Sequence, residues 1–269
     1  MKHPSQVLQG LGLKARKSFG QNFLTSQASL QGFEKIIYPH KSILEIGLGL
    51  GSITEWLTQQ SYTVKVVEKD RLLASYLTEE FKSVKVIEKD ALDIELPDIT
   101  DCSFAIGNLP FQITAPCMQK TIVSWSNLKG ALWGLQYEVA KKLASPRGNS
   151  LALLMQSTGS VRFVRKISRN SFFPVPAVDG GWVYWERNLK DQVNADSIEI
   201  LLRGLFWGKR KKILTVVQKN PHWSKHLVSQ QWQDHYLKAP KSFREKYDSV
   251  RPDTLNVTDI QNFMSQFTG

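Results

Sequence analysis

Cysteine is scarce in this chain. Only Cys102 and Cys117 occur among 269 residues, and neither lies in a Cys-x-x-Cys or a Cys/His cluster. A structural zinc site needs several such ligands at close spacing, so we expect no metal site. Two isolated thiols also fit a reducing cytosol, and we predict a cytoplasmic protein.

Long apolar runs are absent as well. No run approaches the roughly 18 residues that a membrane helix needs, and the polar segment Met1–Gln6 lacks the apolar core of a signal peptide. We therefore expect no membrane partner. The length suits one or two compact domains, and a hydrophobic content of 42% is too high for a disordered chain.

Acidic residues are few relative to basic ones. Lys and Arg number 35 against 24 Asp and Glu, which gives a formal net charge of +11. Such an excess favours a polyanionic partner, because each phosphate that a cation neutralises releases counterions. Nucleic acid is the partner that this charge favours, ahead of an acidic membrane surface. A basic protein without any polyanionic partner is the remaining alternative.

Strand and helix patterns alternate over the first two thirds of the chain, which predicts a parallel sheet with helices on both faces. Short apolar or β-branched runs predict the strands 42–47, 62–68, 84–88, 103–107, 130–135, 161–167 and 178–187. The intervening helices are expected at 52–60, 71–81 and 114–124.

The pattern changes after about Lys190, where the strand signal ends. Helices are expected at 196–207, 209–219, 229–236 and 257–267, with prolines between them. We therefore predict two domains, a catalytic α/β domain over residues 1–188 and a small helical domain over residues 189–269.

A glycine-rich segment follows the first predicted strand and begins a helix. Glycines let a backbone approach a ligand closely, and a helix N-terminus offers unpaired N–H groups. A nicotinamide-binding loop has a GxGxxG spacing, whereas this one is GxGxG after an acidic residue. The pattern fits an S-adenosylmethionine loop better, because that cofactor has no pyrophosphate. The candidate cofactor-binding residues are Glu45, Gly47, Gly49 and Gly51.

Two acidic residues follow the next two strands. Glu68 ends the second strand about 20 residues past the loop, where a carboxylate can accept both ribose hydroxyls of an adenosine. Asp70 is close enough to compete for that role. Asp90 follows the third strand and can accept from the cofactor's adenine amine, although an aspartate there can also simply cap a helix.

The segment Asn108-Leu109-Pro110-Phe111 follows the fourth strand and indicates the reaction. An exocyclic adenine amine is a poor nucleophile, because its lone pair is delocalised into the ring. The Asn108 side-chain carbonyl and the Leu109 backbone carbonyl can hold its two N–H bonds and localise that lone pair. Pro110 stiffens the turn, and Phe111 can stack on the base. A strand-ending turn with a buried phenylalanine is the structural alternative.

Together these residues resemble the ribosomal RNA adenine dimethyltransferases of the kasugamycin-resistance type. The resemblance extends over nearly the whole chain, from residues 17–24 through 136–140 and 172–179 to 251–255. It implies a Rossmann-like seven-stranded methyltransferase sheet with a small C-terminal helical domain. It also implies that Asn22 and Leu24 contact the cofactor, that Asn108 lies beside it, and that Phe173 flanks the target adenine.

The same resemblance implies S-adenosyl-L-methionine as cofactor and a monomer that acts on 16S rRNA in a small-subunit precursor. Two adjacent adenosines near the 3′ end would each be dimethylated. The chain departs from the family at Phe111, where tyrosine is usual, and at Gly180, where serine is usual. The macrolide-resistance enzymes, which methylate 23S rRNA, are the alternative, but they more often carry isoleucine at the position of Leu109.

A basic run in the helical region is the candidate RNA-binding site. It comprises Lys209, Arg210, Lys211 and Lys212. In this family the corresponding helix carries cations placed to meet RNA, whereas an isolated charge run is more often a solvated helix end. Two rival functions are a nicotinamide-dependent oxidoreductase, which has no use for residues 108–111, and a non-catalytic RNA-binding assembly protein.

Overall fold

The computed structural model describes residues 3–15, 21–47, 49–110, 112–145, 149–188, 194–221 and 227–267. The chain divides into two compact units. The first comprises Met1–Lys141 and Arg162–Arg187, and the second comprises Lys142–Val161 and Asn188–Gly269. Phe111, a candidate catalytic residue, lies outside the described residues.

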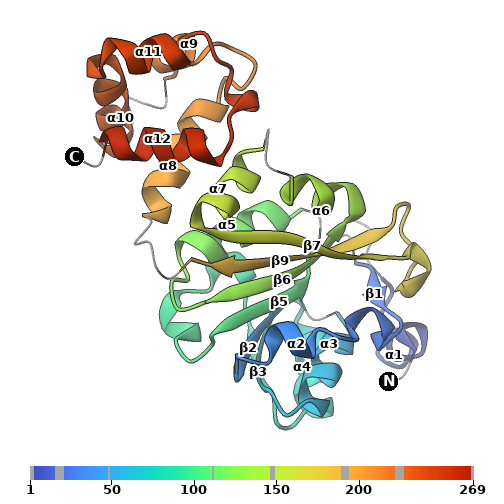
Figure 1. Ribbon diagram of the computed structural model, residues 1–269. Helices are drawn as coiled ribbons and strands as arrows, with labels where there is room; N and C mark the ends of the chain where they lie inside the picture. Colours follow the sequence, from blue (N-terminus) through green and yellow to red (C-terminus); the bar gives the residue numbers. More distant parts are fainter. Residues whose placement is uncertain are drawn as a thin grey trace. The chain divides into compact units, whose positions relative to one another are not determined.

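A seven-stranded sheet forms the centre of the first unit (Figure 1), with the strand order β4-β3-β2-β5-β6-β9-β7. Neighbours from β4 to β6 are parallel, and β9 runs antiparallel to β6. The predicted α/β fold is therefore confirmed. The strands are β2 (Ser42–Ile46), β3 (Thr63–Glu68), β4 (Lys85–Glu88), β5 (Phe104–Asn108), β6 (Gly130–Gln136), β7 (Gly159–Ile167) and β9 (Gly180–Arg187).

The strand order reverses direction between β2 and β5, and this places the motifs together. From β2 the chain continues to β3 and β4 on one side, while β5 and β6 lie on the other. Right-handed crossovers then put helices α3 and α4 on one face of the sheet and α5 on the other (Figure 1). In open α/β sheets, ligands bind in the crevice at the carboxyl ends of the strands where this reversal occurs.

The helices of the first unit start at local signals in the sequence. Asp70 caps α4 by accepting from the backbone N–H groups of Leu72 and Leu73. The predicted helices 52–60, 71–81 and 114–124 each end within one residue of α3, α4 and α5. The α-helices are α1 (Pro4–Gly10), α2 (Glu34–Ile37), α3 (Ser52–Gln59), α4 (Arg71–Glu80), α5 (Thr114–Val123) and α6 (Tyr137–Leu143).

Short elements complete the first unit. A two-stranded antiparallel sheet joins β1 (Phe23–Leu24) to β8 (Phe172–Phe173), segments about 150 residues apart in the sequence. The 3₁₀ helices are η2 (Gln27–Leu30), η3 (Ala91–Asp93), η4 (Leu96–Ile99) and η5 (Arg169–Ser171). The β1–β8 pairing holds the N-terminal segment against the Phe172–Phe173 strand, so both can border one site.

The second unit is helical. It comprises α7 (Ser150–Thr158), α8 (Ala195–Phe206), α9 (Ile213–Lys219), α10 (Leu227–Lys238), α11 (Lys241–Tyr247), η7 (Pro252–Thr254) and α12 (Val257–Phe267). Helix α7 packs against α8 and α12. For this reason residues 142–161 group with the C-terminal helices, whereas the sequence pattern predicts them to belong to the first domain. In the core of this unit the ring of Tyr236 stacks on that of Phe263, and the ring of Tyr247 packs against Phe263 at an angle.

The expected helix over residues 209–219 is wrong at its start. Helix α9 begins at Ile213, and Lys209–Lys212 form a turn between α8 and α9. The Lys212 backbone is extended, with φ −63° and ψ 145°, so the helix cannot continue backward through it. Gly208 lies directly before the basic run, and glycine disfavours a helix interior.

The residues that the structure describes were searched for membrane-spanning helices and for clusters of metal ligands. Among them, no helix is both long enough and apolar enough to span a bilayer. Within the same ranges, no three His, Cys, Asp or Glu side chains gather in a way that could hold a metal ion.

Candidate active site

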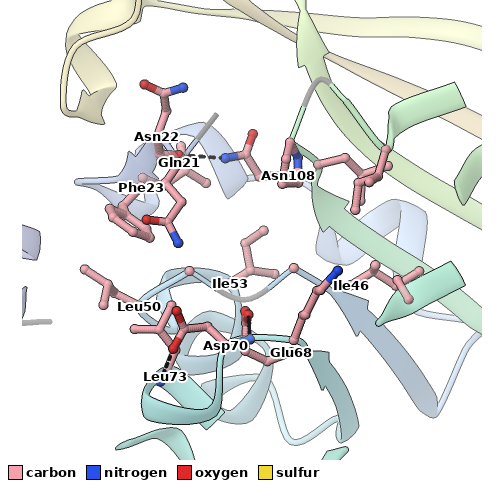
Figure 2. A pocket seen from close by; sticks show the side chains of 18 of the residues that line it. Gln21, Asn22, Phe23, Ile46, Leu50, Ile53, Glu68, Asp70, Leu73 and Asn108 are labelled. Atoms are coloured by element: carbon pink, nitrogen blue, oxygen red, sulfur yellow. Dashed lines mark hydrogen bonds between the residues drawn. The ribbon is translucent and has the colours of Figure 1, made fainter. Parts of the chain in front are cut away.

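A cavity of about 590 Å³ opens at the carboxyl edge of the sheet in the first unit. Residues that follow β2, β3, β4 and β5 form its walls, together with the segment around β1, Pro176 and residues 178–180. Figure 2 shows Glu68 and Asp70 on one side of the cavity and Asn22 and Asn108 on the other. This volume suits a small organic ligand, for which pockets of roughly 300–1,000 Å³ are usual.

The glycine loop follows β2 with a left-handed backbone. Gly47, Gly49 and Gly51 have φ values of 70°, 56° and 84°, a backbone conformation that residues other than glycine rarely adopt. Gly47 and Gly49 line the cavity. A Cβ on Gly49 would lie 2.6 Å from Cδ1 of Phe23, so the loop packs closely against β1. Gly51 is not among the described lining residues, and it faces Phe81.

Glu45 lies beneath the loop and is not among the described residues that line the cavity. Its side chain is fully buried, and its Oε2 accepts a hydrogen bond of 2.7 Å from the Thr54 hydroxyl of α3. Its Oε1 has no partner among the described residues. Burial raises the pKa of Glu45 to about 8, because a charge without water is poorly solvated.

The structure distinguishes Glu68 from its competitor. Both residues border the cavity, but the Asp70 carboxylate accepts from Leu72 N at 3.0 Å and Leu73 N at 3.3 Å as the cap of α4. The Asp70 N–H in turn donates to Glu68 Oε1 over 2.8 Å. This bond orients the Glu68 carboxylate at the cavity edge, so Glu68 is the stronger ribose candidate.

Asp90 also lines the cavity and has two further contacts. Its Oδ1 accepts from Leu92 N at 2.9 Å, which caps η3, and its Oδ2 lies 2.6 Å from Lys69 Nζ. The hydrogen bond from Lys69, followed by that from the Leu92 N–H, holds the pKa of Asp90 below its ordinary value. Asp90 is therefore a charged acceptor in the wall and a helix cap at once.

Asn108 is tied to the N-terminal segment. Its Nδ2 donates to the Asn22 carbonyl over 3.0 Å, a contact between residues 86 positions apart (Figure 2). Asn108 is paired in register with Gly134 on β6. A Cβ at Gly134 would lie 2.9 Å from Asn108 Oδ1, so the missing side chain leaves room for this oxygen. With its amide nitrogen held, Asn108 presents its oxygen as the acceptor.

Leu109 and Pro110 follow Asn108 in the motif and lie at the end of β5. The Pro110 carbonyl accepts from Ile113 N and from the Thr114 hydroxyl, both at 3.1 Å. Leu109 and Pro110 line the cavity, and Pro110 Cδ lies 3.7 Å from the Cβ position of Gly47. The turn after β5 therefore lies directly against the glycine loop.

Phe173 is not among the described residues that line the cavity. Its ring makes an edge contact with His3, with 5.4 Å between centroids, while its strand pairs with β1. The neighbouring Phe172 lines the cavity instead. Since side chains on a strand alternate between faces, these two phenylalanines point in opposite directions.

The glycines at the second departure from the family have a packing role. A Cβ at Gly181 would lie 2.9 Å from Phe163 Cε2 and 3.1 Å from Ala140 Cβ. A Cβ at Gly180 would lie 3.3 Å from both Ile167 and Phe172. The strand packs closely against these neighbours at both positions. This close packing explains why glycine occupies them.

The structure thus brings most of the predicted site residues around one cavity. Those that line it are Asn22, Leu24, Gly47, Gly49, Glu68, Asp90, Asn108, Leu109 and Pro110. Several further residues that line the cavity were not predicted from the sequence, among them Gln21, Phe23, Lys69, Leu72, Phe172 and Asp179. Asp179 and Phe172 occur in a segment already noted for its family resemblance, and that segment was the available signal.

Comparison with known proteins identifies the family of this chain. The sequence model described as ribosomal RNA adenine dimethylase matches residues 12–238. The chain belongs to this family. The predicted family and enzyme class, an S-adenosylmethionine-dependent rRNA adenine dimethyltransferase, are therefore confirmed.

Named relatives are similar in length and sequence. The ribosomal RNA small subunit methyltransferase A of Chlorobium chlorochromatii is 30% identical over 77% of this chain and 82% of its own length. A probable enzyme of the same name from Thermococcus onnurineus is 30% identical over 80% of both chains.

Solved structures support the fold alone. A dimethyladenosine transferase from Plasmodium falciparum has a TM-score of 0.70 at 23% identity, covering 91% of this chain and 97% of its own. The 23S rRNA methyltransferase ErmE has a TM-score of 0.64 at 20% identity, covering 92% of this chain and all of its own.

Proposed function

We propose that this chain dimethylates the N6 amines of two adjacent adenosines near the 3′ end of 16S rRNA, in a small-subunit precursor. The observation that carries the proposal is the junction of Asn108 and Asn22 at the edge of a cavity whose opposite side carries Glu68. Relatives at 30% identity are named for the small subunit, which favours this substrate over 23S rRNA.

The residues around the cavity fit S-adenosylmethionine. Glu68 would accept from the ribose hydroxyls, since Asp70 is engaged in the α4 cap. Asp90 would accept from the adenine amine beside Lys69. Gly47 and Gly49 leave backbone surface open to the amino-acid part, and Asn22 and Leu24 would close the site from the β1 segment. Glu45 and Gly51 would act by shaping the loop.

Bound there, the cofactor supplies a methyl group on a sulfonium, an electrophile that even a weak nucleophile can attack. Asn108 Oδ1 and the Leu109 carbonyl would accept hydrogen bonds from the two N–H groups of the target amine. These two bonds would orient the nitrogen lone pair toward the methyl group. No strong base is required, because the nitrogen becomes acidic only after it gains the methyl. Catalysis is then chiefly positioning. The target base must leave its stack, as in other enzymes that modify bases.

Phe111 would stack on that base, whereas Phe173, whose ring contacts His3, would support the site indirectly from β8. The turn Lys209–Lys212 would dock the enzyme on RNA through phosphates, which position a protein without reading sequence. All four of its side chains are exposed.

Transfer of tritium from labelled S-adenosylmethionine to purified small ribosomal subunits tests the proposal. Subunits that lack the modification should take up label, and the Asn108→Ala variant should transfer none. Label that enters 23S rRNA in large subunits instead would favour the macrolide-resistance type. A lack of label in either, from a chain that binds the cofactor, would favour a non-catalytic assembly protein.

A further inference from the structure

The turn that carries the basic run also carries an exposed tryptophan. Trp207 is 40% exposed, whereas the six other tryptophans that the structure describes are all buried. Tryptophan is usually well buried because its ring is large and mostly apolar. An exposed one beside four exposed cations therefore calls for a reason in function.

The geometry of α8 explains how the ring reaches the surface. The buried side of this helix carries Ile198, Leu201, Leu202 and Leu205, at the spacing of one helical face. Trp207 caps the helix two residues after Leu205, about half a turn away from that face. The Trp207 side chain therefore does not belong to the buried face of α8.

The backbone around Trp207 is held firmly. Gly208 is buried, and a Cβ there would lie 2.8 Å from Val216 Cγ2 of α9. The Lys211 N–H donates to the Gly208 carbonyl over 2.7 Å, and the Ile213 N–H donates to the Val250 carbonyl over 2.8 Å. The turn is thus a fixed support for exposed side chains, which lowers the ordering cost of binding.

Charge and aromatic surface coincide on this turn. Lys211 Nζ lies 4.7 Å from the centroid of the Trp207 ring. The Asp253 N–H approaches the Lys209 carbonyl at 3.4 Å, but the Asp253 carboxylate is bound by Arg251 at 2.7 and 3.1 Å. This neighbouring acid is therefore neutralised locally, and the turn keeps its positive charge.

We propose that Trp207 stacks on an unpaired nucleotide of the RNA while Lys209–Lys212 contact the flanking phosphates. An aromatic ring beside a basic track is the combination that binds single-stranded nucleic acid, since every base has a face on which to stack. Bases inside a duplex are already stacked, so the turn should prefer a loop, bulge or strand end. This inference rests on the proposed function and specifies which RNA the second unit recognises.

The test measures binding of the full chain to two synthetic RNAs, a blunt duplex and a hairpin with an unpaired loop of equal total charge. Wild type should bind the hairpin more tightly. Trp207→Ala should lose about 5- to 150-fold in hairpin affinity, little in duplex affinity and nothing in salt dependence. Trp207→Phe should keep most of the hairpin affinity.

Two controls separate the possible causes. Lys211→Gln should lower the salt slope on both RNAs by about 0.7 to 0.9. Leu237→Ala, which truncates an apolar side chain of similar exposure (41%) in α10, should leave both affinities unchanged. Unchanged hairpin preference in Trp207→Ala would overturn the inference, as would an equal loss in Leu237→Ala.

Methyl transfer at saturating ribosomal subunits distinguishes this inference from the proposed function. Trp207→Ala should keep the wild-type maximal rate there, because Trp207 acts in docking alone. Absent transfer by wild type would overturn the proposed function, and the binding measurements would still decide the role of Trp207.

Discussion

Replacing Glu45 by Gln should change how the stability of this protein depends on pH. Glu45 is fully buried, and burial raises its pKa from 4.5 to about 8. Between these values the folded protein keeps a proton that the unfolded chain has lost. The free energy of unfolding of the wild type should therefore fall as the pH rises from 4.5 to 8 and level off above.

The magnitude follows from the same values. At about 1.4 kcal/mol per pH unit, the interval corresponds to a loss on the order of 5 kcal/mol for the wild type. Glutamine cannot ionise and avoids this loss. Its amide would, however, put buried N–H groups where Oε1 has no described partner, at a cost of about 1–3 kcal/mol. Glu45→Gln should thus be less stable than wild type near pH 5 and more stable near pH 9.

Urea denaturation of both proteins at pH 5, 7 and 9 provides the assay, with midpoints converted through the m-value. Glu88→Gln is the matched control, because it makes the same substitution at an exposed position at the end of β4. If the Glu45→Gln difference were constant across this range, Glu45 would not hold a proton in the folded protein, and the reasoning would be wrong.

Three further predictions concern the cavity. Glu68→Ala should weaken S-adenosylmethionine binding by about 1.5–3 kcal/mol and leave RNA affinity unchanged; an unchanged dissociation constant by calorimetry would move the ribose contact to Asp70. Asn108→Ala should abolish methyl transfer but largely keep cofactor binding, and a near-normal turnover would contradict the role of its carbonyl. Gly134→Ala should displace Asn108 Oδ1 and lower the rate at saturating substrates at least tenfold, with little change in cofactor affinity if the fold persists by circular dichroism.

The motif residues that follow a strand were predictable from the sequence. Parallel strands bring their carboxyl ends to one edge, so Gly47, Glu68, Asp90 and Asn108 had to approach one another once the strands were assigned. The same reasoning could not separate Glu68 from Asp70, because the choice depends on which carboxylate caps α4. It also could not foresee that Glu45 lies beneath the loop against Thr54.

Contacts between segments that are far apart in the chain could not be predicted from the sequence. The bond from Asn108 to Asn22 and the pairing of Phe23 with Phe173 depend on how the N-terminal segment packs, which no local pattern encodes. Phe172 and not Phe173 is among the described residues that line the cavity, and the sequence alone does not show which of the two faces it. The start of α9 was misjudged because four basic residues have good helix propensity, whereas the structure has a turn there.

We propose that this protein dimethylates adenines in small-subunit rRNA. The most direct measurement is mass spectrometry of 16S rRNA fragments after incubation of unmodified small subunits with the protein and S-adenosylmethionine. We predict dimethyladenosine at two adjacent positions near the 3′ end with the wild type, and unmodified adenosine there with Asn108→Ala, which cannot position the target amine. An unmodified 3′ fragment, or dimethyladenosine found only in 23S rRNA, would contradict it.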